Sequence, residues 1–82
     1  MRLLYFGRLA EVAGSRGGEV AVPDGIATVA ALRDWIDREQ PELGAALAGS
    51  TVRVVIADAY AADDHPLAGV TEIAFIPPVS GG

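Results

Sequence analysis

The spacing of apolar residues along the chain divides it into short strands and one longer helix. Apolar runs over residues 2–6 and 19–22 predict the first two strands, since aliphatic and aromatic residues are typical of strands. Between them, residues 9–13 suffice for a single helical turn closed by Gly14, and residues 15–18 are expected to form a loop. These two strands are close enough in sequence to pair as a hairpin.

A main helix is predicted to begin after Thr28, whose hydroxyl can accept a hydrogen bond from a free N–H of the first turn. Val29, Leu32 and Ile36 recur at helical spacing, so one face of the helix is apolar. Proline restricts the residue before it to extended conformations, so the helix is expected to stop just before Pro41.

The second half of the chain predicts one more short helix and three strands. In order, these are a helix over residues 41–48 ended by Gly49, a central strand over 51–56, a turn over 57–59, a short strand over 60–62 and a last strand over 72–76. Pro77 and Pro78 end the last pairing because proline has no backbone donor.

This order of elements, two strands, a helix and two or three strands, predicts an α+β domain. One amphipathic helix packed on a small mixed sheet is the β-grasp, or ubiquitin-like, arrangement. We expect residues 1–76 to form the β-grasp domain and residues 77–82 to form a flexible C-terminal Gly-Gly tail.

Composition excludes several kinds of function. The 82 residues contain no cysteine, which rules out a disulfide scaffold, a thiolate metal site and a cysteine nucleophile. The net charge of −5 disfavours nucleic-acid binding, although it suits either plain solubility or a partner with a basic face. No apolar run is long enough to cross a membrane and no signal-peptide pattern is present, so we expect a cytoplasmic protein without membrane association.

No self-contained catalytic centre is evident, so the chain is not expected to be an enzyme on its own. Asp63, Asp64 and His65 could bind a cation, but neighbouring residues in a turn rarely converge on one metal, and turn chemistry is favoured. Ser50 and Ser80 have no identifiable companion base. We therefore expect no bound cofactor and no metal.

The C-terminus offers different chemistry. Gly81 and Gly82 lack Cβ atoms, so they can pass through a narrow channel, and the terminal carbonyl is unhindered on its own side. A carboxylate becomes an acyl donor once it is converted to an acyl-adenylate, and a sulfur nucleophile could then displace AMP to leave a thiocarboxylate. In this hypothesis Gly82 supplies the reacting carbonyl and Gly81 supplies clearance.

The whole chain resembles the small subunit of molybdopterin synthase, a sulfur carrier. Four stretches carry the resemblance: Leu3-Leu4-Tyr5-Phe6-Gly7 with residues 11–14, Thr28-Val29 with Ala31-Leu32-Arg33, Asp64-His65-Pro66-Leu67, and the terminus from Glu72 to Gly82. The last stretch is the most diagnostic. One departure is Ala57-Asp58, where an Asn or a Gly is expected in the turn.

The resemblance implies a pathway and its partners. An E1-like adenylyltransferase would use ATP to adenylate Gly82, and a sulfur-donor protein would convert it to a thiocarboxylate. The tail would then enter the large synthase subunit, within a heterotetramer, and donate sulfur to cyclic pyranopterin monophosphate. Alternatives are a carrier for thiamin thiazole or tRNA thiolation, a ubiquitin-like protein modifier, and an interaction module.

Contacts with these partners are expected near the tail. The candidates are Phe75, Pro77, Pro78, Val79 and Ser80, although strand parity alone leaves Phe75 equally suited to the core. The chain also contains no lysine, and we hypothesise that this prevents an activated C-terminus from acylating another copy of the same chain. Surface lysines that produced no covalent oligomers during activation would contradict that idea.

Overall fold

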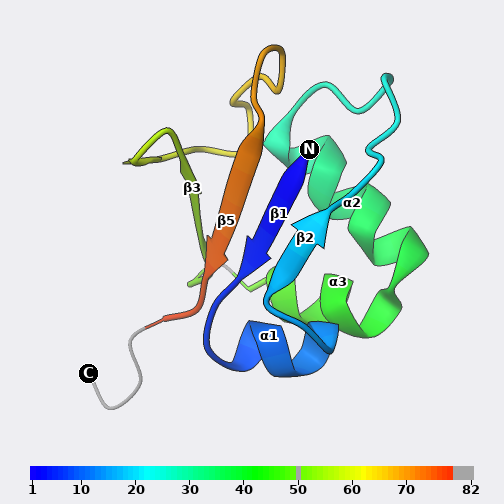
Figure 1. Cartoon of the computed structure of the whole chain (residues 1–82), viewed down its shortest axis with the longest axis vertical. Coiled ribbons are helices and arrows are strands. Elements are labelled where there is room, and N and C mark those ends of the chain that lie inside the picture. Colours follow the sequence, from blue (N-terminus) through cyan, green and yellow to red (C-terminus); the bar gives the residue numbers. More distant parts are fainter. Residues whose placement is uncertain (50, 79–82) are drawn as a thin grey trace.

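A computed structural model describes residues 1–49 and 51–78 of the chain. It contains three helices and one five-stranded sheet (Figure 1). In chain order the elements are β1 (Arg2–Tyr5), α1 (Arg8–Ala13), β2 (Gly17–Glu19), α2 (Val29–Glu39), α3 (Pro41–Leu47), β3 (Arg53–Ile56), β4 (Ala59–Tyr60) and β5 (Glu72–Ile76). None of these helices has the length and apolar character that crossing a bilayer requires.

The strand order in the sheet is β2-β1-β5-β3-β4. The central strand, β5, runs parallel to its neighbour β1, and every other pair is antiparallel. Helices α2 and α3 lie behind the sheet in Figure 1. One sheet face is therefore covered and the other is open, which is the β-grasp arrangement predicted from the sequence.

The core lies between the sheet and the helices. Alternate strand residues point into it, and these are Leu3 and Tyr5 of β1, Val54 and Ile56 of β3, and Ile73 and Phe75 of β5. The same cluster contains Val29, Leu32 and Ile36, the three residues whose spacing predicted the apolar face of α2. The residues at helical spacing in α2 and the alternate residues of the strands thus pack together in a single core.

Helix α2 begins where Thr28 predicts, but its cap also uses a distant loop. The Thr28 hydroxyl accepts a hydrogen bond from Ala31 N at 3.2 Å. The two preceding N–H groups donate to backbone carbonyls, Val29 N to His65 O at 3.1 Å and Ala30 N to Asp63 O at 2.8 Å. Donors that a helix start normally leaves free are therefore satisfied by the 63–65 turn.

The second strand lies earlier than predicted. The sequence predicts this strand over residues 19–22 after a loop, whereas β2 covers Gly17–Glu19. A Cβ at Gly17 would overlap the Leu3 carbonyl of the paired strand, so only glycine permits this close pairing. Two adjacent glycines resemble a loop in the sequence, although here they form a strand.

Helices α2 and α3 cross closely at Gly44, which yields a prediction. Helix propensity alone predicts that Gly44→Ala would stabilise the protein by about 1 kcal/mol. A Cβ at Gly44 would instead overlap the backbone and side chain of Asp37 on α2. Overpacking costs about 1–3 kcal/mol and sometimes more. We expect a net loss of about 2 kcal/mol.

Urea unfolding of Gly44→Ala measures this loss. Gly25→Ala is the control, because a Cβ at Gly25 would meet no atom within 4 Å. A Gly44→Ala variant as stable as the parent would show that α2 and α3 are not packed this tightly.

The turn between β3 and β4 explains the departure at Ala57-Asp58. Ile56 pairs with Ala59, so the hairpin loop has two residues, and both have positive φ, 52° at Ala57 and 65° at Asp58. A type I′ turn requires this conformation and favours Asn-Gly. The turn that the family pattern suggests is therefore present, with a residue at Ala57 that is poorly suited to it.

Ala57→Asn is accordingly expected to raise the free energy of unfolding by about 0.5–1 kcal/mol, because Asn tolerates the left-handed region better than Ala. Thermal or urea unfolding measures the gain. Ala48→Asn is the control, since Ala48 is exposed but has an ordinary right-handed φ of −72°. An equal gain in both variants would contradict the explanation.

Candidate functional site

The end of β5 is the point from which the predicted reactive tail departs. Strand β5 ends at Ile76, as predicted, and is followed by a half-buried Pro77 and an exposed Pro78. The parallel neighbour β1 ends beside it, where Phe6 N donates to Phe75 O at 3.2 Å. The predicted site residues Val79, Ser80, Gly81 and Gly82 lie outside the described residues.

Phe75 is a core residue, which resolves the choice left open by the sequence. Its side chain is 0% exposed and stacks on Tyr5, with ring centroids 5.7 Å apart and an interplanar angle of 14°. In this structure the Phe75 side chain is therefore part of the core and not of the surface that a partner could contact. Ile73 and Phe75 point to the helices, while Ala74 and Ile76 point to the open face.

The open face carries an apolar row across four strands. Ala74 of β5 is in register with Leu4 of β1 on one side and with Val55 of β3 on the other, and Val55 faces Tyr60 of β4. Leu4, Val55 and Ala74 are half-buried, and Tyr60 is 70% exposed. We call this set, together with Phe6 and Ile76 toward the tail, the open-face row.

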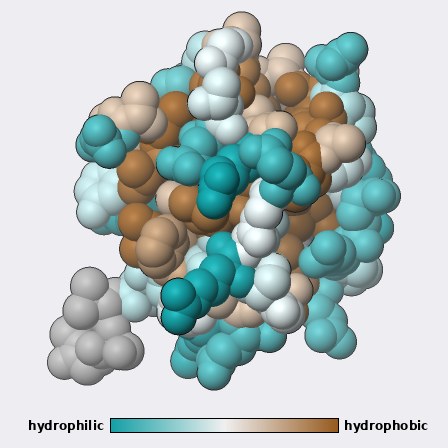
Figure 2. Space-filling model, in the orientation of Figure 1, coloured by the Kyte–Doolittle hydropathy of each residue, from teal (hydrophilic) through white to brown (hydrophobic). Residues whose placement is uncertain are grey.

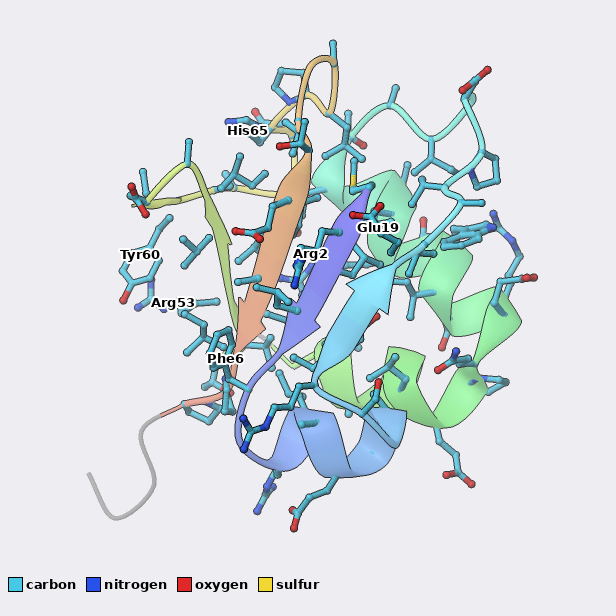
Figure 3. The ribbon with its side chains drawn as sticks, viewed as in Figure 1. Arg2, Phe6, Glu19, Arg53, Tyr60 and His65 are labelled. Atoms are coloured by element: carbon cyan, nitrogen blue, oxygen red, sulfur yellow. The ribbon has the colours of Figure 1, made fainter. Side chains whose placement is uncertain are left out.

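Charged residues flank the open-face row. Arg2 pairs in register with Glu72 and Glu19 at the start of the strands, and Arg2 Nε lies 3.7 Å from Glu72 Oε1. At the tail end, Arg53 lies over the Tyr60 ring, with Cζ 5.1 Å from its centroid. Figure 2 shows hydrophobic areas of this face on both sides of a hydrophilic band. In Figure 3, Arg53 and Tyr60 lie beside β3 and Phe6 lies near the end of β5.

This composition is that of a protein interface. Apolar side chains with aromatic and arginine residues beside them are typical of surfaces that bind another protein, and here a hydrophilic band separates the apolar areas. The open-face row is not predicted from the sequence. Its sequence signal is that the strands over residues 51–56 and 72–76 are apolar on both faces, a pattern that also fits a central strand.

A groove beside the end of β1 adjoins this surface. It has a volume of about 480 Å³ and is lined by Leu4, Tyr5, Phe6, Gly7, Ala10 and Arg16. Burial raises the pKa of the Tyr5 phenol above its ordinary value, so this hydroxyl is neutral at physiological pH. The side chains that line the groove are apolar apart from Arg16 and the Tyr5 hydroxyl.

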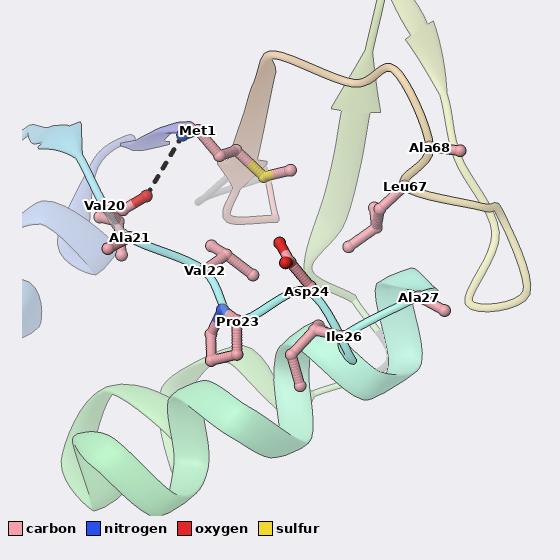
Figure 4. Close-up of a pocket in the computed structure, with 10 residues that line it drawn as sticks. All are labelled: Met1, Val20, Ala21, Val22, Pro23, Asp24, Ile26, Ala27, Leu67 and Ala68. Carbon is pink, nitrogen blue, oxygen red and sulfur yellow. Dashed lines mark hydrogen bonds between the residues drawn. The ribbon is translucent and has the colours of Figure 1, made fainter.

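Another groove lies at the opposite end of the sheet (Figure 4). It holds about 400 Å³ and is walled by apolar side chains that include Met1, Val22 and Leu67. The Met1 amine donates to Val20 O at 3.2 Å on its rim. Because β1 and β5 are parallel, Met1 lies at the far end of the strands from Pro77, so this groove is separate from the tail.

The predicted turn over residues 63–67 has a structural role. His65 N donates to Ala62 O at 3.0 Å, which closes the turn, and His65 Nδ1 lies 2.8 Å from Pro66 O. The Asp63 carboxylate lies 3.3 Å from Arg33 Nε. Within the described residues no group of three His, Cys, Asp or Glu side chains is arranged to hold a metal ion.

Comparison with known proteins gives consistent matches over the full chain. A model of the ThiS family matches residues 3–82. The molybdopterin synthase sulfur carrier subunit of Escherichia coli (strain K12) is 32% identical over 82 residues, which cover 100% of this chain and 99% of that protein.

Two crystal structures resemble the fold closely. SAMP1 from Haloferax volcanii matches with a TM-score of 0.82 and 38% identity, covering 100% of this chain and 98% of that one. A second structure, of the H. volcanii small archaeal modifier protein 1, matches with a TM-score of 0.79 and 35% identity, covering 96% and 97%. The predicted β-grasp fold is confirmed.

Proposed function

Because this chain belongs to the ThiS family, we propose that it is the sulfur carrier subunit of a molybdopterin synthase. The observation that supports this most is its 32% identity to such a subunit across nearly the whole of both chains. In this proposal, the β-grasp domain presents the tail, and the tail carries the sulfur.

The reaction uses the Gly82 carboxylate in three steps. A carboxylate oxygen attacks the α-phosphorus of ATP on an E1-like adenylyltransferase, and pyrophosphate leaves. A sulfide-equivalent nucleophile from a donor protein attacks the acyl carbon, and AMP leaves with one carboxylate oxygen. The resulting thiocarboxylate donates its sulfur to cyclic pyranopterin monophosphate on the large subunit, and water restores the carboxylate.

The intact mass of the protein tests the first two steps. After incubation with ATP, the cognate activating enzyme and a sulfur donor, the mass should rise by the difference between a sulfur atom and an oxygen atom. Omitting ATP is the control and should leave the mass unchanged. A mass that stays constant with all components present would overturn the proposal.

The open-face row is the proposed docking surface for the large subunit. Val55→Asp places a carboxylate between Ala74 and Tyr60, where docking would remove it from water. We expect the affinity for the large subunit to fall by tenfold or more, as for a central interface residue. Calorimetry or surface plasmon resonance measures the change.

Val22→Asp is the matched control for this variant. Val22 is also a half-buried valine, but it lines the groove at the opposite end of the sheet. Its affinity for the large subunit should equal that of the parent chain. An equal loss in both variants would indicate a general loss of stability, and the docking surface would have to lie elsewhere.

A second candidate is a protein modifier joined to lysine side chains. It is favoured by the 38% identity to SAMP1 over the full chain. The same acyl-adenylate would then be attacked by an amine in place of sulfur, giving an isopeptide bond. Incubation with ATP, the activating enzyme and a lysine-rich acceptor protein separates the two: covalent conjugates favour the modifier, whereas dithiolene formed with the large subunit and pterin precursor favours the carrier.

A further inference from the structure

Gly7 lies directly beside the last described part of the chain. Its φ is 55° and its ψ is −134°, a conformation that favours glycine. A Cβ added there would lie 2.9 Å from Pro77 Cγ and 3.8 Å from Pro77 Cδ. The backbone of Gly7 and the ring of Pro77 therefore pack with no room for even a methyl group.

The Gly7 side of this contact is held firmly. Phe6 N donates to Phe75 O at 3.2 Å, which joins the residue before Gly7 to the central strand. Leu9 N donates to Phe6 O and Ala10 N donates to Gly7 O, both at 3.1 Å, so helix α1 begins on these two carbonyls. Leu9 itself is 1% exposed and anchors α1 in the core.

The Pro77 side has little freedom of its own. A proline ring fixes φ, and each proline also restricts the residue before it, so Ile76 and Pro77 are both confined to extended conformations. The ring is closed onto its own backbone and cannot rotate away from a neighbour as an open side chain can. Pressure on the ring is therefore transmitted to the direction of the main chain at Pro78.

We propose that Gly7 and Pro77 are positioning residues, whose contact sets the direction in which the C-terminal segment leaves the sheet. This inference rests on the proposed function for its consequence: the segment after Pro78 must deliver Gly82 into the active site of another protein. Four residues span at most about 14 Å, so the position and direction of the chain at Pro78 limit where the Gly82 carbonyl can reach. Misplacement of about 1 Å can slow a reaction about a hundredfold.

The direction can be measured on the carrier alone. The chain has no cysteine, so Glu11→Cys on the exposed side of α1 accepts a single nitroxide label. Paramagnetic broadening of the Val79–Gly82 amides then reports their distribution about the domain. Pro77→Ala and Gly7→Ala should both change this profile, while Gly14→Ala should not. Gly14 also has a positive φ, 82°, but a Cβ there would meet nothing within 4 Å.

Kinetics of loading supply the second readout, with the carrier as the varied substrate of the activating enzyme. Pro77→Ala should lower kcat about tenfold with a smaller change in KM, because the rest of the surface that the carrier offers to the activating enzyme is unchanged. Adding Gly7→Ala to Pro77→Ala should slow loading less than adding it to the parent chain, since the ring that the methyl group would strike is gone and only the backbone strain at Gly7 remains. Gly7→Ala combined with Pro78→Ala should instead show multiplied losses.

The possible outcomes separate this inference from the proposed function. An unchanged broadening profile in Pro77→Ala would overturn it, and so would a Gly14→Ala variant as slow as Gly7→Ala, because backbone strain would then explain the loss. A changed profile with a parent chain that takes up no sulfur would support the positioning role while removing the sulfur-carrier proposal.

Discussion

Phe75→Ala is expected to lower the free energy of unfolding by about 3–5 kcal/mol, the usual cost of removing a large buried aromatic side chain. Phe75 is completely buried on β5, the central strand, and its ring stacks on Tyr5. A domain of this size has a total stability of about 5–10 kcal/mol. Much of the margin would therefore be lost, and urea unfolding should show a much lower midpoint.

Phe6→Ala is the matched control for that substitution. Phe6 is the same residue type but is 48% exposed, so its removal should cost less than about 1.5 kcal/mol. In a binding assay, the two positions should show the opposite order of effects. Phe75→Leu, which keeps most of the buried volume, should bind the large subunit like the parent chain, whereas Phe6→Ala should bind more weakly. The reverse pattern would restore Phe75 as a partner contact.

Phe75 also illustrates what the sequence could not decide. The strand over residues 72–76 was predicted with its correct bounds. Because Ile73-Ala74-Phe75-Ile76 is apolar at every position, the sequence does not show which of these side chains face the helices. Only the register with Val54 of β3 and Tyr5 of β1 determines which alternate residues face the helices. A strand that is apolar on both faces carries no alternation from which to read that choice.

Features with local causes were predictable. Thr28 caps α2, and Pro41 ends it at the predicted residue. Both effects depend only on residues that are close by in the sequence. Features that depend on distant backbone were not. The carbonyls of Asp63 and His65 complete the cap of α2, and every residue has such a carbonyl, so no side chain signals the role.

The candidate site divides in the same way. The chemistry proposed for Gly81 and Gly82 follows from residue type and position alone, and it stays a prediction. The open-face row could not be inferred in this way, because Leu4, Val55 and Ala74 come from three strands that are adjacent only in the folded sheet. The Gly7–Pro77 contact joins residues 70 positions apart, and it too requires the parallel pairing of β1 with β5.

Deletion of Gly82 is expected to abolish sulfur loading and leave the domain folded. The reaction proposed above takes place at the Gly82 carbonyl, and a shortened chain would present the carboxylate of Gly81 one residue, or about 3.5 Å, short of the same position. Since displacement of about 1 Å can cost about a hundredfold in rate, loading should fall below detection in the intact-mass assay. No cluster residue of the described core lies beyond Phe75, so the unfolding midpoint should not change.

Two further variants test whether the position of the terminal carboxylate is what matters. An alanine added after Gly82 also displaces the carboxylate, in the opposite direction, and should load as poorly as the deletion. Gly25→Ala changes a glycine at which a Cβ would meet nothing within 4 Å, and it should load like the parent chain. If the deleted chain still gained sulfur, the acyl group would not have to be that of Gly82, and recognition would depend on the domain and not on the exact end of the tail. If the shortened and the lengthened chain both fold but fail to load, the activating enzyme requires a fixed number of residues between the β-grasp domain and the terminal carboxylate.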